Sequence, residues 1–334
     1  MMRAVLKLLG VLVLVVLVLL AGAYAYVQFT WQRDYSGTPL PAITASTDPA
    51  VIARGEYVAN AVAHCSACHM LAGRSPGSPI DWDQPFAGGY VWEIPLFGRF
   101  VAANITPDVE TGIGGMSDAQ LARAIRHAVG RDGRILPFML LAIGHMSDED
   151  LTGVVSYLRS RPAVRQVNTS EEWGIMARAL AGSFTPRLTP VPADVPAGGG
   201  PSVARGRYLA EGPAACRECH TQRDDFTFLL VGVPFAGNTT PEADAKHEGF
   251  EFVYPNLTPD PETGHITGWD EEAFLKRFRG GRVHEASSMP WENFARMTDD
   301  DIRSIYRFLR TLTPVKNLVG PPHRKVGDTP AGQR

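Results

Sequence analysis

The pentapeptide Cys-x-x-Cys-His occurs twice in this chain, and it constrains the fold more than any other feature. The copies are Cys65-Ser66-Ala67-Cys68-His69 and Cys216-Arg217-Glu218-Cys219-His220. Two thiols at this spacing can add across the two vinyl groups of one haem, and the adjoining histidine can then ligate the iron. We therefore predict two covalently bound haem c groups. The attachment residues are Cys65, Cys68, Cys216 and Cys219, and the proximal iron ligands are His69 and His220.

The sequence Cys-x-x-Cys also occurs in zinc knuckles and in redox-active disulfides. A zinc site needs further ligands at finger-like spacing, and a redox disulfide has no use for a histidine that follows immediately. The chain contains four cysteines, and the two motifs use all of them. No thiol remains for a disulfide, a third haem or a thiolate iron ligand, so the haem interpretation is favoured.

The N-terminus combines basic residues with a long apolar run. Arg3 and Lys7 precede the uncharged stretch 8–27, and about 20 apolar residues suffice to cross a bilayer as a helix. Aromatic residues follow where the chain would leave the hydrocarbon, as is typical of a membrane interface. We predict an anchor over residues 1–30 that crosses the bacterial inner membrane once and leaves the haem domains in the periplasm.

A cleaved signal peptide is the alternative interpretation, because Ala21-Gly22-Ala23 fits the small-residue rule for processing. Both interpretations export the chain, in agreement with covalent haem attachment outside the cytoplasm. The remaining composition is that of a globular protein, with 20% charged residues and a net charge of −3. It lacks the basic excess that nucleic-acid binding requires, so nucleic acid is not an expected partner.

The chain is also an internal duplication. Arg54-Gly55-Glu56-Tyr57 recurs as Arg205-Gly206-Arg207-Tyr208, and Asn104-Ile105-Thr106-Pro107-Asp108 recurs as Asn256-Leu257-Thr258-Pro259-Asp260. We predict one domain at 48–161 and its copy at 202–315. The Pro/Gly-rich stretch 162–201 is assigned to a linker and 316–334 to a tail.

Helix signals recur at the same places in both copies. Asp48-Pro49 is typical of a helix start, Ser117 with Gln120 predicts a capping box, and Ser147 and Thr298 are candidate N-caps of the last helix of each copy. We therefore expect an all-α fold in which helices surround each haem motif.

The second axial ligand of each iron decides its chemistry, because a methionine closes the site for electron transfer whereas an open site permits catalysis. Met139 and Met289 lie in proline-bearing loops at similar distances beyond their haem motifs, and we predict that they are the distal ligands. His145 is the alternative in the first copy. Met146 and Met297 directly precede cap residues, where packing explains them.

Together these strings resemble the multihaem cytochrome c subunits of membrane-bound alcohol and gluconate dehydrogenases. The resemblance covers about residues 50–315, and its most specific parts are 104–112 and 256–264. It implies two tandem class I cytochrome c domains with His/Met ligation. The chain differs in having two haem motifs where those subunits usually have three, and in its N-terminal anchor.

The resemblance also implies two structural roles. Tyr57 and Tyr208 are expected to pack where the first and last helices of a copy cross, beside Gly55 and Gly206, which permit close approach. The Asn-x-Thr-Pro-Asp turns are expected to wall the haem crevices.

The predicted function is a membrane-anchored periplasmic diheme cytochrome c in a respiratory chain. It would relay electrons from a periplasmic dehydrogenase to a quinone, a terminal oxidase or a small cytochrome, without a catalytic residue of its own. The alternative is a diheme enzyme such as a cytochrome c peroxidase, for which one distal methionine would be missing. An enzyme with a cysteine distal ligand is disfavoured by the cysteine count.

Overall fold

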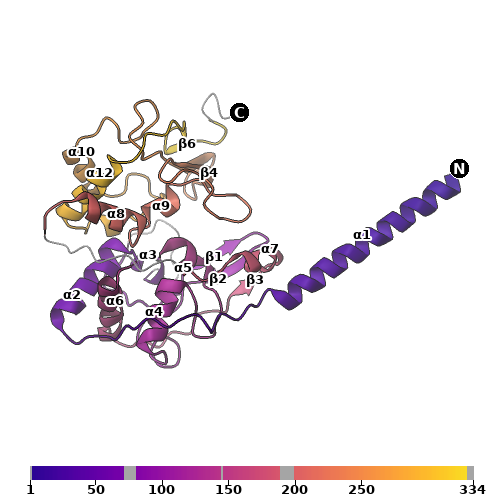
Figure 1. Ribbon diagram of the computed structural model, residues 1–334, viewed down its shortest axis with the longest axis horizontal. Coiled ribbons are helices and arrows are strands. Elements are labelled where there is room, and N and C mark those ends of the chain that lie inside the picture. Colours follow the sequence, from indigo (N-terminus) through magenta and orange to yellow (C-terminus); the bar gives the residue numbers. More distant parts are fainter. Residues whose placement is uncertain (1, 71–79, 144–145, 189–198, 329–334) are drawn as a thin grey trace.

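The computed structural model describes residues 2–70, 80–143, 146–188 and 199–328. Helix α1 (Met2–Thr30) stands apart from the rest of the chain and buries none of its residues (Figure 1). It is 29 residues long, and by length and composition it could cross a membrane. An N-terminal signal sequence passes the same test, so both interpretations of this segment stay open.

The first copy is a set of short helices with a small sheet beside its haem motif. Its elements are α2 (Pro49–Tyr57), the π-helical turn η1 (Val58–Val62), α3 (Ser66–His69), β1 (Val91–Ile94), β2 (Gly98–Val101), α4 (Asp118–His127), α5 (Pro137–Ala142) and α6 (Asp148–Ser160). The Asp48 side chain caps α2, and Ser117 and Gln120 form the predicted capping box of α4. Local cap chemistry therefore sets the helix starts as predicted.

The second copy repeats this order after a connecting segment. The connection contains β3 (Glu172–Trp173), α7 (Ile175–Leu180) and the 3-10 turn η2 (Ala181–Ser183). The second copy consists of α8 (Val203–Glu211), α9 (Cys216–Cys219), β4 (Asn238–Ala243), β5 (Phe250–Tyr254), α10 (Glu271–Arg279), α11 (Trp291–Phe294), α12 (Asp299–Leu309) and β6 (His323–Lys325). Ser147 and Thr298 cap α6 and α12, as predicted.

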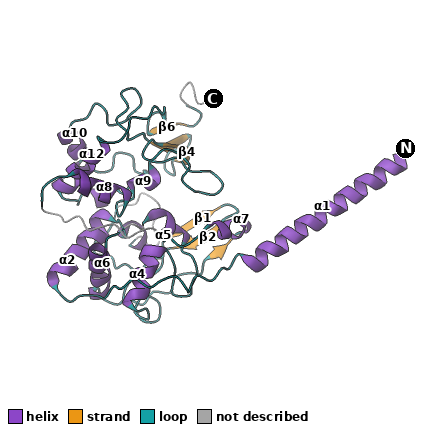
Figure 2. Ribbon diagram, viewed as in Figure 1, coloured by secondary structure: helices purple, strands orange, loops and turns teal. Residues whose placement is uncertain are grey.

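The prediction of an all-α fold is wrong. The strands form two three-stranded antiparallel sheets, β1-β2-β3 and β4-β5-β6 (Figure 2). In each sheet, a hairpin that follows the haem motif is joined by a third strand from the stretch assigned to the linker or the tail. These strands are too short for a period-2 hydrophobic pattern to separate them from loops. The domain boundaries 48–161 and 202–315 stay a prediction.

The first and last helices of each copy cross at a glycine, as expected. A Cβ added at Gly55 would lie 1.8 Å from the carbonyl oxygen of Gly153, and one at Gly206 would lie 1.8 Å from that of Ser304. No side chain fits at either crossing, because these distances are far inside van der Waals contact. Glycine therefore sets how closely α2 approaches α6 and how closely α8 approaches α12.

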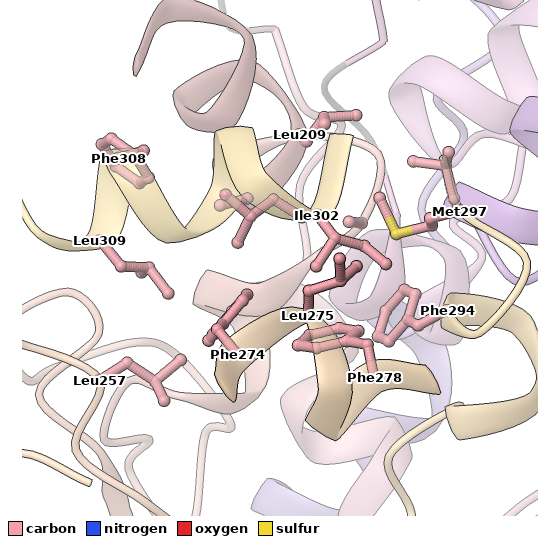
Figure 3. Packing of buried hydrophobic residues seen from close by; sticks show 14 of the residues in the cluster. Leu209, Leu257, Phe274, Leu275, Phe278, Phe294, Met297, Ile302, Phe308 and Leu309 are labelled. Atoms are coloured by element: carbon pink, nitrogen blue, oxygen red, sulfur yellow. The ribbon is translucent and has the colours of Figure 1, made fainter. Parts of the chain in front are cut away.

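Each copy has its own hydrophobic core, and the second core extends into the first copy. In the second copy, α10 and α12 enclose an aromatic cluster that includes Phe274, Phe278 and Phe308 (Figure 3). Ala61 and Val62, from the turn η1 of the first copy, belong to this same cluster. The two copies therefore share part of one core.

A reciprocal exchange of tyrosines joins the copies. The Tyr57 hydroxyl donates to Asp301 Oδ2 (2.6 Å) at the start of α12, and the Tyr208 hydroxyl donates to Asp150 Oδ2 at the start of α6. Each aspartate also forms an ion pair with an arginine of its own copy. Asp150 pairs with Arg54, and Asp301 pairs with Arg205. The expectation for these tyrosines was incomplete, because each hydroxyl reaches the last helix of the other copy.

Candidate haem sites

The first motif forms one turn of helix beside the core of the first copy. His64 adopts a left-handed conformation (φ 43°) directly before Cys65, and α3 follows. Cys65 packs against the core of this copy, whereas Cys68 packs beside Tyr90. Both cysteines are free thiols, and burial raises their pKa values to about 12 and about 11. Neutral thiols therefore lie on one short turn, facing apolar surroundings.

The second motif repeats this geometry. Ala215 adopts the same left-handed conformation (φ 52°) directly before Cys216, and α9 follows. Cys216 packs against the aromatic core of the second copy, and burial raises its pKa to about 12, whereas Cys219 is exposed. The duplicated sequence thus produces a duplicated local structure.

Both motif histidines are oriented by a backbone carbonyl. Nδ1 of His69 lies 2.7 Å from the oxygen of Ala103, and Nδ1 of His220 lies 2.9 Å from that of Pro255. A carbonyl can only accept, so Nδ1 carries the proton and Nε2 keeps its lone pair. This is the tautomer that a metal-ligating histidine needs, with the second nitrogen held by an outer hydrogen bond.

Burial also keeps these imidazoles neutral. It lowers the pKa of His69 below its ordinary value and lowers that of His220 to about 4. A protonated ring could not ligate a metal, because both nitrogens would then be donors. At neutral pH each site therefore presents an imidazole with a free lone pair.

The repeated Asn-x-Thr-Pro-Asp string supports the orienting carbonyl in each copy. Ala103 and Pro255 directly precede Asn104 and Asn256. Each asparagine accepts from the backbone N–H of the threonine two residues on, and donates to a carbonyl beyond the last helix, that of Val164 or Val315. The turn that follows the histidine's partner is therefore fixed to the rest of the fold.

Met139 and Met289 each share a hydrophobic cluster with the first cysteine of their own copy. Met139 is half-buried in the cluster that contacts Cys65, and Met289 is half-buried in the cluster that contacts Cys216. Their backbones differ, because Met139 lies inside α5 whereas Met289 comes before Pro290, the N-cap of α11. Iron ligation by both methionines stays a prediction.

The competing candidates have different positions. Met146 and Met297 are each 2% exposed and lie within the two cores, where packing accounts for them. His145 lies outside the described residues. In the part of the chain that the structure describes, no three His, Cys, Asp or Glu side chains form a group that could hold a metal ion.

The second copy contacts the first haem motif through Asn293 of α11, which the sequence analysis did not single out. Asn293 Nδ2 donates to Ser66 Oγ (2.7 Å), inside the first haem motif, and to the backbone oxygen of Asn60. Asn293 and Ser66 have no exposed surface. The available signal was a departure from the repeat, because Ser66 stands in the first motif where Arg217 stands in the second.

Comparison with known proteins gives a consistent set of relatives. The cytochrome c subunit of an alcohol dehydrogenase (quinone) from Gluconacetobacter polyoxogenes is 31% identical over 296 residues, which are 84% of this chain and 59% of that protein. A gluconate 2-dehydrogenase cytochrome c subunit from Pantoea cypripedii is 33% identical over 79% of this chain and 60% of its own length. The chain is a homologue of dehydrogenase cytochrome c subunits.

A third relative is closer to this chain in length. A diheme cytochrome c-type protein from Cereibacter sphaeroides is 27% identical over 66% of this chain and 74% of its own length. No protein-family model matches the chain. The chain spans about three-fifths of the length of the alcohol and gluconate dehydrogenase subunits.

The residues present fit haem c, the covalently bound group that this kinship implies. At each site, two neutral thiols on one turn are followed by an imidazole whose Nε2 is available, and a thioether lies in the same cluster. Thioether bonds and one histidine ligand are the attachment chemistry of c-type haem. Both copies therefore contain the thiols and the histidine that covalent attachment and proximal ligation require.

Proposed function

We propose that the chain is a membrane-anchored periplasmic diheme cytochrome c that relays electrons from a periplasmic dehydrogenase to a quinone or a terminal oxidase. The observation that carries this proposal is the pair of equivalent sites, in each of which a carbonyl holds the histidine at Nδ1 and leaves Nε2 available. Bound haem c supplies a one-electron couple at each site. The residues of the chain hold, orient and shield these groups.

In this proposal, four thiols fix two haems and two His/Met pairs close their axial positions. The attachment residues are Cys65, Cys68, Cys216 and Cys219, and the axial pairs are His69 with Met139 and His220 with Met289. Methionine ligation raises the potential and excludes other ligands, as an electron carrier requires. The half-buried, apolar setting of both methionines supports this role.

The interface between the copies supports a relay rather than two independent carriers. Asn293 links the first motif to α11, the helix that follows Met289, and the tyrosine exchange fixes α6 and α12 relative to each other. The contacts of Asn293 with Ser66 and of Tyr208 with Asp150 are buried, and that of Tyr57 with Asp301 is half-buried, so together they hold the two copies against each other. A fixed separation between the redox groups gives a constant rate of internal transfer.

A row of aromatic rings connects the first site with the foot of α1. Successive ring centroids are 4.3 to 5.4 Å apart, and the row begins at the cluster that contains Cys68. Its members are Trp92, Phe138, Phe100, Trp173 and Trp31. This row supports the first copy as the one that faces the membrane.

The foot of α1 is fixed to the body. The Arg178 guanidinium donates to Gln28 Oε1 (2.6 Å) and lies over the ring of Trp31. An open hollow here is lined by Trp31, Trp173 and Glu171, among others. A quinone dissolved in the bilayer would meet the protein at this height, which favours a quinone as the acceptor.

The test is to purify the full-length holoprotein in detergent and to determine its haem content, spin state and redox potentials. Two haems per chain, both low-spin with methionine ligation, are expected. Met289→Ala and Met139→Ala should each convert one haem to a high-spin form and change its potential. Met297→Leu and Met146→Leu are matched controls, because they alter core methionines of the same copies and should leave both spectra unchanged.

The result in the first copy also distinguishes the electron relay from the alternative enzyme. If Met139→Ala leaves both haem spectra unchanged, Met139 is not a ligand, and peroxide turnover at an open first haem becomes the function to test. If the purified chain contains no covalent haem, the relay proposal fails.

A further inference from the structure

The loop at residues 224–234, after the second haem motif, exposes an unusual number of apolar side chains. Phe226, Leu229, Val231 and Val233 are 46 to 66% exposed. The segment from Phe226 to Pro234 contains no charged residue. Isolated exposed apolar residues are ordinary, whereas a contiguous group of them marks a surface that contacts another apolar phase.

The backbone of this loop is held in place by its own hydrogen bonds. Asp224 Oδ1 accepts from the backbone N–H groups of Phe226 and Thr227, and Asp224 N donates to the oxygen of Leu229. Phe228 adopts a left-handed conformation (φ 59°), which is strained for an aromatic residue. The loop therefore presents its apolar side chains in a defined arrangement rather than collapsing onto the core.

A continuous chain of contacts connects this loop with α1. The ring of Phe228 packs against that of Phe97 (5.2 Å between centroids), at the tip of the β1–β2 hairpin. The oxygens of Leu96 and Phe97 accept from the N–H groups of Met176 and Gly174, at the start of α7. Helix α7 in turn holds the foot of α1 through Arg178.

The residues along this path continue the apolar surface. Leu96 is 71% exposed and Ile175 is 41% exposed. On α1 itself, Phe29 is 88% exposed and lies where the helix would leave the hydrocarbon. Strands β1 and β2 and helix α7 lie on the side of the body from which α1 departs, and α10 lies on the other side (Figure 1).

We propose that the loop 224–234, together with Leu96, inserts its side chains into the surface of the same bilayer that α1 crosses. The proposal rests on the membrane anchorage of α1 in the proposed function. Lipid fits this surface because the exposed side chains are aliphatic and aromatic and no basic residue lies between 226 and 234. Insertion would then be driven by apolar burial and would not require anionic lipid.

Attachment at two points would orient the haem domains. An anchor helix alone can tilt in the bilayer together with the body fixed to it, whereas a second contact from the second copy would hold both copies against the membrane surface. The aromatic row from the first site would then end at the bilayer in every molecule.

The test places a nitroxide label on the loop of the full-length holoprotein in phosphatidylcholine nanodiscs. Because haem attachment uses all four native cysteines, Leu229→Cys introduces the one thiol available for labelling. Ala273→Cys, exposed on α10, is the matched control. The measurement compares collisions of the label with oxygen, which concentrates in lipid, and with a water-soluble nickel complex. The ratio of oxygen to nickel accessibility at 229 should exceed that at 273 several-fold.

Val231→Cys provides a second label should the first variant lose its haem spectrum. Nickel accessibility at both 229 and 231 equal to that at 273 would overturn the proposal and leave a protein partner as the occupant of the loop. Failure of the anchorage gives a different result, because the unlabelled holoprotein would then elute apart from the nanodiscs.

Discussion

Replacing Tyr208 with phenylalanine removes one hydroxyl from the interface between the copies and keeps the ring. That hydroxyl donates to Asp150 and accepts from the backbone N–H of Ser147, and all three residues are buried. A hydrogen bond to a charged group contributes about 1.5–3 kcal/mol, and a neutral one contributes about 1 kcal/mol. We expect Tyr208→Phe to lower the free energy of unfolding by about 3 kcal/mol.

Tyr57→Phe makes the equivalent change in the other copy and should cost less. The Tyr57 hydroxyl donates to the buried Asp301, but the N–H that it accepts belongs to Thr298, which is exposed. Water can replace the lost acceptor there, so the expected loss is about 2 kcal/mol. Tyr306→Phe is the matched control within the second copy, where a bond to a backbone carbonyl is lost at a cost of about 1 kcal/mol.

The assay is urea unfolding of the holoprotein, followed by circular dichroism and by haem absorbance. The loss of unfolding free energy should be largest for Tyr208→Phe, smaller for Tyr57→Phe and smallest for Tyr306→Phe. Tyr208→Phe and Tyr57→Phe should also separate the unfolding transitions of the two copies, because each variant removes hydrogen bonds that join one copy to the other. A loss of under about 0.5 kcal/mol for Tyr208→Phe, the usual range of an inconsequential surface change, would refute the reasoning.

Two further predictions concern packing and acid stability. Gly206→Ala should destabilise the holoprotein by about 3 kcal/mol in the same assay, because the new Cβ meets a backbone oxygen, whereas Gly268→Ala, with open space around it, should stay near the wild type. Burial alone would raise the pKa of Asp244, but hydrogen bonds from a backbone N–H and two histidine rings outweigh it and lower this pKa to about 2. Its stabilising effect is therefore complete above about pH 4 and is lost as the pH falls toward 2. Asp244→Asn should flatten the pH dependence of the urea midpoint in that range, and an unchanged slope would contradict this assignment.

The sequence predicted the local chemistry of this chain better than its sheets. Cap residues such as Ser117 and Thr298 act on backbone groups a few positions away, so their effect is readable from the sequence. The crossing glycines were also predictable, because a repeated glycine beside a repeated tyrosine marks a close approach. Strand β3 has two residues and pairs with a hairpin far away in sequence. No local sequence pattern predicts such a pairing.

The reach of the tyrosines could not be predicted for a different reason. In a duplicated chain, Asp150 and Asp301 occupy equivalent positions, so the sequence cannot show whether Tyr57 bonds the aspartate of its own copy or that of the other. The contact with Asn293 is similarly hidden, since it joins positions that have different residues in the two copies. The partner of each tyrosine and the contact of Asn293 are both determined by how one copy packs on the other.

The tyrosine exchange has the form of an isologous interface, in which the same surface of two units meets itself. Two separate chains, each with one haem motif, could make these contacts as a symmetric homodimer whose formation depends on concentration. Joining them in one polypeptide makes the association intramolecular. It also allows the two halves to differ, as at Asn293, which contacts Ser66 and has an alanine at the equivalent position of the first copy.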